Sequence, residues 1–227
     1  MSMTHPETNI LLNKTFLFIT GVEGSGTTMM LKVLDTLDNI AVLGGNYWSP
    51  DLQPLAEQFN VLTERLWNKT HQLAHAEKKR IIQDINTLPI PPQYSHVVHK
   101  RSFPFLDEHH WPSLTDAKNF ATDTKILIMQ RNIMDNTQSI LRRGFESNPG
   151  IAHRRSVSGY NLLELQKNKH LSSCLFFSYE DIIDRNIKEN LLLHLATYIN
   201  LPDANLHKMA KIISNPTRHP CKPNSTI

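Results

Sequence analysis

Two short segments of this sequence carry residue types suited to holding phosphate. The first is Gly21-Val-Glu-Gly-Ser-Gly-Thr-Thr28, a glycine-rich stretch that follows an apolar run and also contains hydroxyl side chains. Glycines let the backbone fold tightly so that its N–H groups point inward, and a following helix N-terminus adds unpaired donors and partial positive charge. The second segment runs from Arg131 to Ser139. A guanidinium group donates two parallel hydrogen bonds to a phosphate, so the two segments together predict a site for a phosphate-rich ligand.

Both segments have a plainer interpretation. The glycine-rich stretch can be an ordinary turn between a strand and a helix, and Arg131 can form a surface ion pair with Asp135. The surroundings favour the anion site. Residues 15–20 form a continuous apolar run typical of a strand buried on both faces, and apolar residues recur at helical spacing over 28–37.

The elements that must position these segments alternate along the chain. Apolar runs predict strands over 15–20, 94–99, 125–130 and 175–178, and a short strand or loop over 40–48, broken at Gly44 and Gly45. Helical periodicity predicts helices over 28–37, 54–85, 135–143 and 187–199, with a shorter helix over 203–213. Such alternation is typical of an α/β fold in which a parallel sheet is flanked by helices in three layers. We expect residues 1–227 to form a single domain, because no linker or repeat divides them.

The loop argues against hydrolysis of ATP or GTP. A kinase or ATPase loop reads Gly-x-x-x-x-Gly-Lys-Ser/Thr, whereas Thr27 occupies the lysine position here. Without that lysine, the β- and γ-phosphates lose their main cationic contact. The sequence therefore favours phosphate binding without γ-phosphate chemistry, and a P-loop nucleotide kinase or NTPase stays as an alternative.

Charge and composition argue against several other kinds of protein. The formal net charge is +3 and the sequence pI is about 8.8, which is mildly basic and lacks the dense basic stripe of a nucleic-acid binder. The polar N-terminus predicts no signal peptide, and no apolar stretch predicts a membrane span. Two cysteines make no disulfide framework. We therefore expect a cytoplasmic protein without a nucleic-acid partner, and the sequence predicts no oligomeric state.

Three segments together resemble the sulfotransferase family that uses 3′-phosphoadenylyl sulfate (PAPS). Ser25-Gly-Thr-Thr28 is similar to the loop that binds the 5′-phosphosulfate, and Arg131-Asn-Ile-Met-Asp with Ser139 eight residues after the arginine resembles the 3′-phosphate motif. Ser178-Tyr-Glu-Asp-Ile-Ile183 is similar to the family's Tyr-Glu-Asp-Leu stretch. The resemblance covers roughly residues 15–38, 95–145 and 174–202.

This resemblance implies a P-loop NTPase-like sulfotransferase fold and transfer of a sulfuryl group from PAPS to a hydroxyl or amine, with no metal required. The nucleotide-binding residues that it implies are Glu23, Gly24, Ser25, Gly26, Thr27, Thr28, Arg131, Ser139 and Tyr179.

One departure from the family pattern concerns charge. Gly24 stands where the family usually has Lys or Arg, and Glu23 stands where it has Pro. A carboxylate beside an anion is unfavourable, so another cation must replace the missing one. Lys100 and Arg101, at the end of the third predicted strand, are the candidates, and alternation along the strand predicts that only one of them faces the ligand.

Transfer to a hydroxyl also needs a group that accepts the acceptor's proton, and His suits this near neutral pH. His99 is one candidate, although it precedes Lys100 whereas the family's histidine follows the lysine. The pair His109 and His110 is an equal candidate, and the carboxylates of Asp107 and Glu108 are further ones. Adjacent histidines can bind metal, but no third ligand lies at useful spacing, so we expect no metal site.

Three functions remain from these residues: a PAPS-dependent sulfotransferase, a P-loop kinase or NTPase, and a nucleotide-binding protein of the same fold without catalysis. The last agrees with the charge pattern at Glu23 and Gly24. Residues 39–94 and 144–170 carry no resemblance, and we expect them to build the acceptor pocket. A small-molecule or glycan acceptor fits, and the sequence favours none among sugar, lipid, phenol and peptide hydroxyls.

Overall fold

The computed structural model describes residues 9–44, 47–67, 73–103, 112–170, 174–184, 186–202 and 208–209. Within these residues six strands form one sheet in the order β3-β2-β4-β1-β5-β6. Five strands run parallel, and the short β3 pairs antiparallel with β2. The strands are β1 Thr15–Gly21, β2 Ile40–Gly44, β3 Tyr47–Trp48, β4 His96–Lys100, β5 Asp123–Gln130 and β6 Cys174–Ser178.

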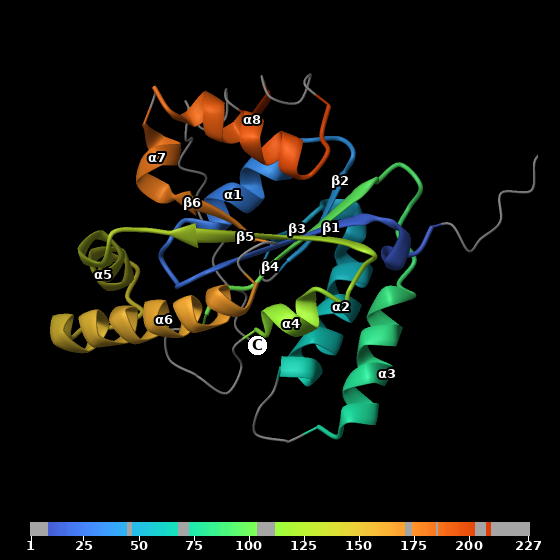
Figure 1. The fold of residues 1–227 in the computed structure, drawn as a ribbon, viewed down its shortest axis with the longest axis horizontal. Coiled ribbons are helices and arrows are strands. Elements are labelled where there is room, and N and C mark those ends of the chain that lie inside the picture. The colour runs from blue at the N-terminus through green and yellow to red at the C-terminus, as the bar shows by residue number, and fades with distance from the viewer. Residues whose placement is uncertain are drawn as a thin grey trace, which may run out of the picture.

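Helices cover both faces of this sheet (Figure 1), so the predicted three-layer α/β fold is confirmed. Helices α1, α7 and α8 lie on one face, and α2, α3, α4 and α6 lie on the other. The helices are α1 Thr27–Leu34, α2 Gln53–Trp67, α3 His75–Asn86, α4 Leu114–Ala117, α5 Ile133–Arg142, α6 Pro149–His170, α7 Tyr179–Ile183 and α8 Lys188–Tyr198, with 3-10 turns at η2 Leu11–Asn13 and η3 Pro50–Leu52.

Alternation along the central strand explains the two layers of core. In β1, Phe16 and Phe18 enter the cluster beneath α2 and α3, whereas Leu17 and Ile19 enter the cluster beneath α1 and α8. All four side chains are fully buried. Since successive strand residues point to opposite faces, only a strand apolar at every position can serve two cores, as the sequence predicts for this segment.

The sheet order brings the predicted site segments to one edge. β1 lies between β4 and β5 and pairs parallel with both. The carboxyl ends of these three strands therefore meet, and they lead into the glycine loop, Lys100 and Arg131. The chain leaves β1 towards β2 on one side and later returns as β5 on the other, which creates the crevice where ligands of open α/β sheets bind.

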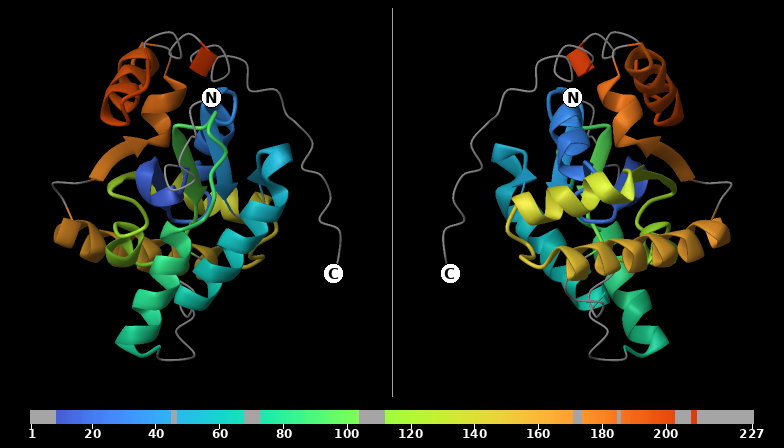
Figure 2. Two further views of the ribbon diagram at one scale, coloured as in Figure 1. Left: turned by 90° about the vertical axis from the view of Figure 1, so that its right-hand side faces the viewer. Right: turned by 90° about the vertical axis from the view of Figure 1, so that its left-hand side faces the viewer.

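Two helical predictions differ from the structure. The segment expected as one helix over 54–85 contains two, α2 and α3, and residues 68–72 between them lie outside the described part. Helix α6 lies in a segment for which the sequence predicted no helix, because its apolar residues form no single stripe: Leu163 is fully buried whereas Leu165 is 62% exposed. Figure 2 shows α6 lying beside α5. The expected helix over 203–213 falls almost wholly outside the described residues.

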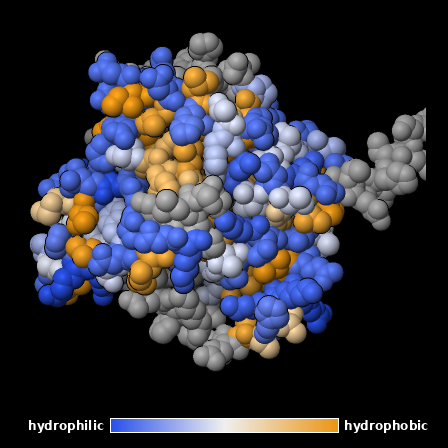
Figure 3. Space-filling view, in the orientation of Figure 1, coloured by the Kyte–Doolittle hydropathy of each residue, from blue (hydrophilic) through white to orange (hydrophobic). Residues whose placement is uncertain are grey.

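The surface in the orientation of Figure 1 is mostly hydrophilic, with small apolar groups (Figure 3). Ile183, Ile187 and Leu193, in and between α7 and α8, are among the exposed large apolar residues. Within the described residues, no helix has the length and apolar character needed to cross a bilayer.

Candidate functional site

The segment Gly21–Thr28 folds as a tight loop between the central strand and the first helix. Gly24 and Gly26 have φ values of 88° and 96°, in the left-handed region that favours glycine. Gly26 is the N-cap of α1, and the Ser25 amide donates to the Val22 carbonyl at 3.0 Å. The first amides of a helix have no partner within it, so the loop closes around free donors.

The chain that continues from β4 holds the floor of this loop. The amides of Arg101 and Phe103 donate to the carbonyls of Ile19 and Gly21 at 3.0 and 2.8 Å. The Thr20 hydroxyl donates to the Arg101 carbonyl at 2.8 Å. At the start of α1 the hydroxyls of Thr27 and Ser102 lie 3.1 Å apart and share a hydrogen bond. The loop is therefore fixed by the sheet at both of its ends.

The two left-handed glycines also permit close contacts. A Cβ at Gly24 would lie 2.6 Å from Oδ1 of Asn136 and 3.5 Å from Cβ of Ser139, both on α5. A Cβ at Gly26 would lie 2.5 Å from the ring of Tyr179, at the start of α7. Thus α5 and α7 both press against the loop. A side chain at position 24 would stand on a left-handed backbone and would have to displace the Asn136 carboxamide, so lysine or arginine is unfavourable there.

Arg131 reaches the loop from the end of β5. Its Nη1 donates to the Gly24 carbonyl at 3.2 Å, and its guanidinium carbon lies 4.3 Å from the centre of the Tyr179 ring. Its Nε lies 4.0 Å from Oε1 of Glu180, and its backbone amide donates to the Tyr160 hydroxyl at 3.0 Å. The structure therefore brings Arg131 and Tyr179 together with the glycine loop.

Polar atoms without partners gather at this place. Among the described residues, five buried side-chain nitrogen or oxygen atoms have no hydrogen-bond partner, and three of them surround the loop: Ser25 Oγ, Arg131 Nε and Asn136 Oδ1. Leaving a buried polar group unpaired costs about 1–3 kcal/mol. Such a cluster is expected where a ligand supplies the missing partners.

Lys100 and Arg101 point to opposite faces of the sheet. Arg101 forms an ion pair with Glu64 of α2. Lys100 alternates with it, and burial lowers the pKa of its ammonium, an effect that the charge of Glu23 opposes and that of Arg143 reinforces. Glu23 in the loop and Arg143 after α5 are thus close enough to act on Lys100. Of the two candidates, only Lys100 lies on the α1 face, where the loop opens.

His99 lies on the other face of the sheet, away from the loop. Its side chain is fully buried against Phe18, Phe59 and Trp67, and its Nδ1 donates to the Leu43 carbonyl at 3.0 Å. Burial lowers the pKa of this imidazole to about 3. The structure does not bring His99 to the residues around the loop. His109, His110, Asp107 and Glu108 lie outside the described residues.

Three residues at the site were not predicted. Asn136 is three residues before Ser139 on the same helix, so helical spacing would have placed it on the same face. Gly159 of α6 lies against the loop, since a Cβ there would be 3.1 Å from a methyl group of Val22. Its neighbour Tyr160 accepts hydrogen bonds from the Arg131 amide and from Asn136 Nδ2. No local pattern in the sequence indicates either α6 residue.

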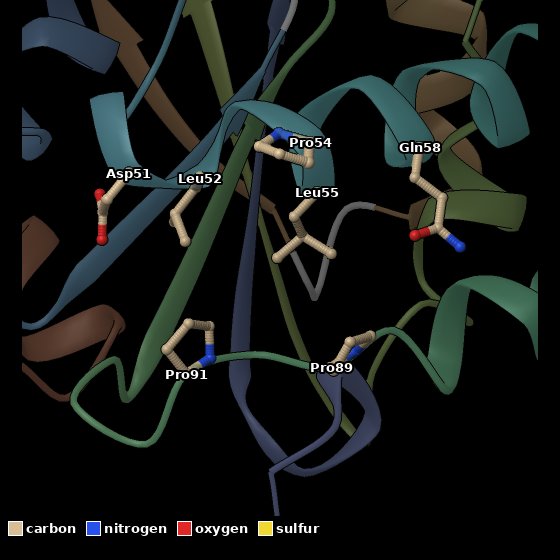
Figure 4. Close-up of a pocket in the computed structure, with 7 residues that line it drawn as sticks. All are labelled: Asp51, Leu52, Pro54, Leu55, Gln58, Pro89 and Pro91. Atoms are coloured by element: carbon tan, nitrogen blue, oxygen red, sulfur yellow. The ribbon is translucent and has the colours of Figure 1, made fainter.

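A surface groove lies away from the glycine loop (Figure 4). It is a groove of about 320 Å³ lined by Asp51, Leu52, Pro54, Leu55, Gln58, Pro89 and Pro91. Pro89 pairs with Ile10, shortly before β1, so the groove lies near the amino end of the strand whose carboxyl end carries the loop. Within the described residues, no three His, Cys, Asp or Glu side chains are grouped to hold a metal ion.

Comparison with solved structures finds both sulfotransferases and kinases. The chain is similar to the sulfotransferase domain of the Synechococcus PCC 7002 olefin synthase (18% identity, TM-score 0.48, covering 85% of this chain and 77% of that one). It is also similar to mouse sulfotransferase SULT7A1 complexed with PAP (14%, TM-score 0.49, 92% and 68%) and to shikimate kinase from Bacteroides thetaiotaomicron (12%, TM-score 0.47, 82% and 99%). No family model and no curated protein matches the sequence. At these identities, the functional argument rests on the site itself.

Proposed function

We propose that this chain binds a nucleotide carrying both a 5′- and a 3′-phosphate at the glycine loop, and that it transfers a sulfuryl group from PAPS to a hydroxyl or amine. The observation that carries the proposal is the set of buried unpartnered polar atoms on Ser25, Arg131 and Asn136, gathered around one phosphate-type loop. A phosphorylated ligand would supply acceptors to the donors among them.

The proposal assigns two anion positions to this site. One is the N-terminus of α1 with its hydroxyls, which suits the 5′-phosphate that carries the sulfuryl group. The other is the α5 side of the loop, where Arg131 and the buried Ser139 approach Gly24. Two separate anion positions favour a bisphosphate nucleotide over a ligand with a single phosphate chain.

Sulfuryl transfer is favoured over γ-phosphate transfer by the position of the cation. The helix residue that would be lysine in a kinase loop is Thr27, whose hydroxyl is hydrogen-bonded to Ser102. The nearby cation comes instead from the end of β4, where Lys100 lies within the electrostatic influence of Glu23. During sulfuryl transfer negative charge grows on the oxygen between sulfur and the 5′-phosphate, and a fixed cation beside the loop stabilises it.

The proposal is tested by nucleotide binding to wild type and to Arg131→Ala. We expect 3′-phosphoadenosine 5′-phosphate to bind far better than adenosine 5′-phosphate. The variant should lose roughly 10- to 150-fold in affinity for the first ligand, since a hydrogen bond to a charged group contributes about 1.5–3 kcal/mol, and little for the second. Isothermal titration calorimetry measures both affinities.

Arg142→Ala is the matched control, because it removes an equal charge from an exposed position on α5. An equal loss for both ligands in Arg131→Ala would show that Arg131 does not contact the 3′-phosphate. Incubation with ³⁵S-labelled PAPS and a panel of hydroxyl and amine acceptors then tests transfer. Nucleotide binding without transfer to any acceptor would favour the non-catalytic alternative.

A further inference from the structure

Asn136 is a buried amide at the loop to which the proposed function gives no specific contact with the ligand. Its side chain is fully buried on α5, and its Oδ1 faces Gly24, where a Cβ would lie 2.6 Å away. Its Nδ2 lies 3.1 Å from the Tyr160 hydroxyl, to which it donates. The Oδ1 has no hydrogen-bond partner. The end of the amide that faces the loop is therefore the end without a partner.

In this arrangement the Tyr160 hydroxyl accepts two hydrogen bonds, but its own proton has no acceptor among the described residues. The hydroxyl accepts from Asn136 Nδ2 and from the Arg131 amide, at 3.1 and 3.0 Å. Burial raises the pKa of Tyr160, so the hydroxyl keeps its own proton and can donate one hydrogen bond. Among the described residues no hydrogen bond is found in which this hydroxyl donates, while Asn136 Oδ1, at the other end of the neighbouring carboxamide, lacks a donor.

Exchanging the oxygen and nitrogen of the carboxamide gives the Tyr160 proton an acceptor and turns the unpartnered end of the amide from an acceptor into a donor. The two ends have the same shape, and the hydrogen-bond network decides which is which. In the exchanged orientation the Tyr160 hydroxyl accepts from the Arg131 amide and donates to Asn136 Oδ1. The Nδ2 group then faces Gly24, and its two N–H donors point at the loop.

We infer that the Asn136 carboxamide is an anion-binding donor, oriented by Tyr160, which contacts the same phosphate as Arg131 and Ser139. The three side chains approach Gly24 together: Arg131 donates to its carbonyl at 3.2 Å, and Asn136 and Ser139 both lie within 3.5 Å of its Cβ position. The ligand class is a phosphate monoester. This inference rests on the proposed nucleotide function.

The role also explains why a neutral amide stands at this position. Glu23 already brings a negative charge to the loop, and Glu180 lies 4.0 Å from Arg131. A carboxylate at position 136 would repel the ligand, whereas an apolar side chain would leave the proton of the Tyr160 hydroxyl without its acceptor, although the hydroxyl would still accept from the Arg131 amide. An amide satisfies the tyrosine with one end and the ligand with the other.

The test uses Asn136→Asp, which keeps the shape and replaces the donor with a carboxylate. We expect the affinity for 3′-phosphoadenosine 5′-phosphate to fall about tenfold or more at neutral pH. Lowering the pH until the new carboxyl is protonated should restore part of the affinity, because a carboxylic acid donates. Asn168→Asp, the same change at an exposed position of α6, is the control and should bind like wild type.

Tyr160→Phe is a second variant that keeps the half-buried ring and removes the group that orients the amide. We expect a several-fold loss of affinity with a retained fold, followed by circular dichroism. Unchanged affinity in Asn136→Asp, or in Tyr160→Phe if the first variant does not fold, would overturn the inference.

Inorganic pyrophosphate serves as a second probe and separates the two ideas. If wild type binds pyrophosphate but not the bisphosphate nucleotide, the proposed function fails, and Asn136→Asp is then measured against pyrophosphate. If wild type binds the nucleotide and both variants bind it equally well, the inference alone fails. If wild type binds neither probe, the loop is no anion site and both are wrong.

Discussion

Gly26 meets two demands that no other residue type meets together. Its φ of 96° lies in the left-handed region, and the Tyr179 ring occupies the space of a side chain, 2.5 Å from the Cβ position. Gly144 has a similar φ of 70° but open space around it. Substituting alanine at Gly144 therefore tests the cost of the left-handed backbone alone, whereas substituting it at Gly26 adds the cost of the contact with Tyr179.

We predict that Gly144→Ala lowers the free energy of unfolding by about 1–2 kcal/mol, the cost of the left-handed conformation alone. Gly26→Ala should cost clearly more and should also abolish nucleotide binding, because the ring of Tyr179 must move. In a Tyr179→Ala background the extra cost should largely disappear. Urea unfolding of wild type, the three single variants and the double variant Gly26→Ala/Tyr179→Ala measures this. Equal costs at the two glycines would show that the contact with Tyr179 is unimportant.

The sequence singled out residues whose spacing is set within one loop or one helix. The loop and the pair Arg131 and Ser139 are recognisable because their spacing is fixed by one turn and one helix. Tyr160 was missed because it reaches the site only through packing of α6 on α5. His99 shows the converse: its residue type suggested a base, but the strand turns it into an aromatic cluster on the other face.

At the scale of elements, the alternation of β4 decides which basic side chain lies on the side of the sheet where the loop opens. His99 and Arg101 point to the α2 side, and Lys100 between them points to the α1 side. A shift of one residue would exchange them. The sequence predicted that one of the two cations faces the ligand, but which face the loop occupies depends on where α1 packs.

We predict that Lys100→Ala lowers turnover with saturating PAPS by roughly 10²–10³-fold while the affinity for 3′-phosphoadenosine 5′-phosphate changes little, because its charge acts on the transition state. Arg101→Ala should have a much smaller effect on turnover, since its partner is Glu64. Steady-state assays of both variants give the comparison. A larger loss in Arg101→Ala, or no loss in either, would remove Lys100 from the proposed mechanism.

At the scale of the whole molecule, the sheet is held between two apolar clusters, and one of them contains a buried imidazole. Phe18, Phe59 and Trp67 surround His99 beneath α2. The sequence predicted the sheet and its two helical layers because the alternation of apolar runs and helical periodicity extends over most of the chain. It did not predict α6, whose burial comes from neighbours distant in sequence.

Stability should depend on pH through His99. Its pKa is about 3 in the folded protein and 6.5 in the unfolded chain, so between these values the unfolded chain binds the additional proton. The stabilisation is therefore complete above about pH 6.5 and is lost as pH falls towards 3, by up to about 1.4 kcal/mol per pH unit. Urea unfolding of wild type and His99→Gln between pH 4 and pH 7 measures this contribution.

The free energy of unfolding of His99→Gln should fall less steeply than that of wild type as the pH is lowered. His96, whose pKa burial also lowers, remains in both proteins, so the difference between the two curves isolates His99. Parallel curves would mean that His99 does not titrate in this way.

The hydrogen bonds from Arg101 and Phe103 to the end of β1 have a consequence for how the loop can change. Because the central strand and its neighbour hold the loop, its ordering entropy is lost when the chain folds and not when a ligand arrives. Ligand capture then requires little rearrangement, which favours affinity. The same connection means that a substitution loosening the loop also loosens the middle of the sheet. The affinity for the ligand and the thermal stability of the fold are therefore coupled, and a substitution selected or engineered to change one is expected to change the other.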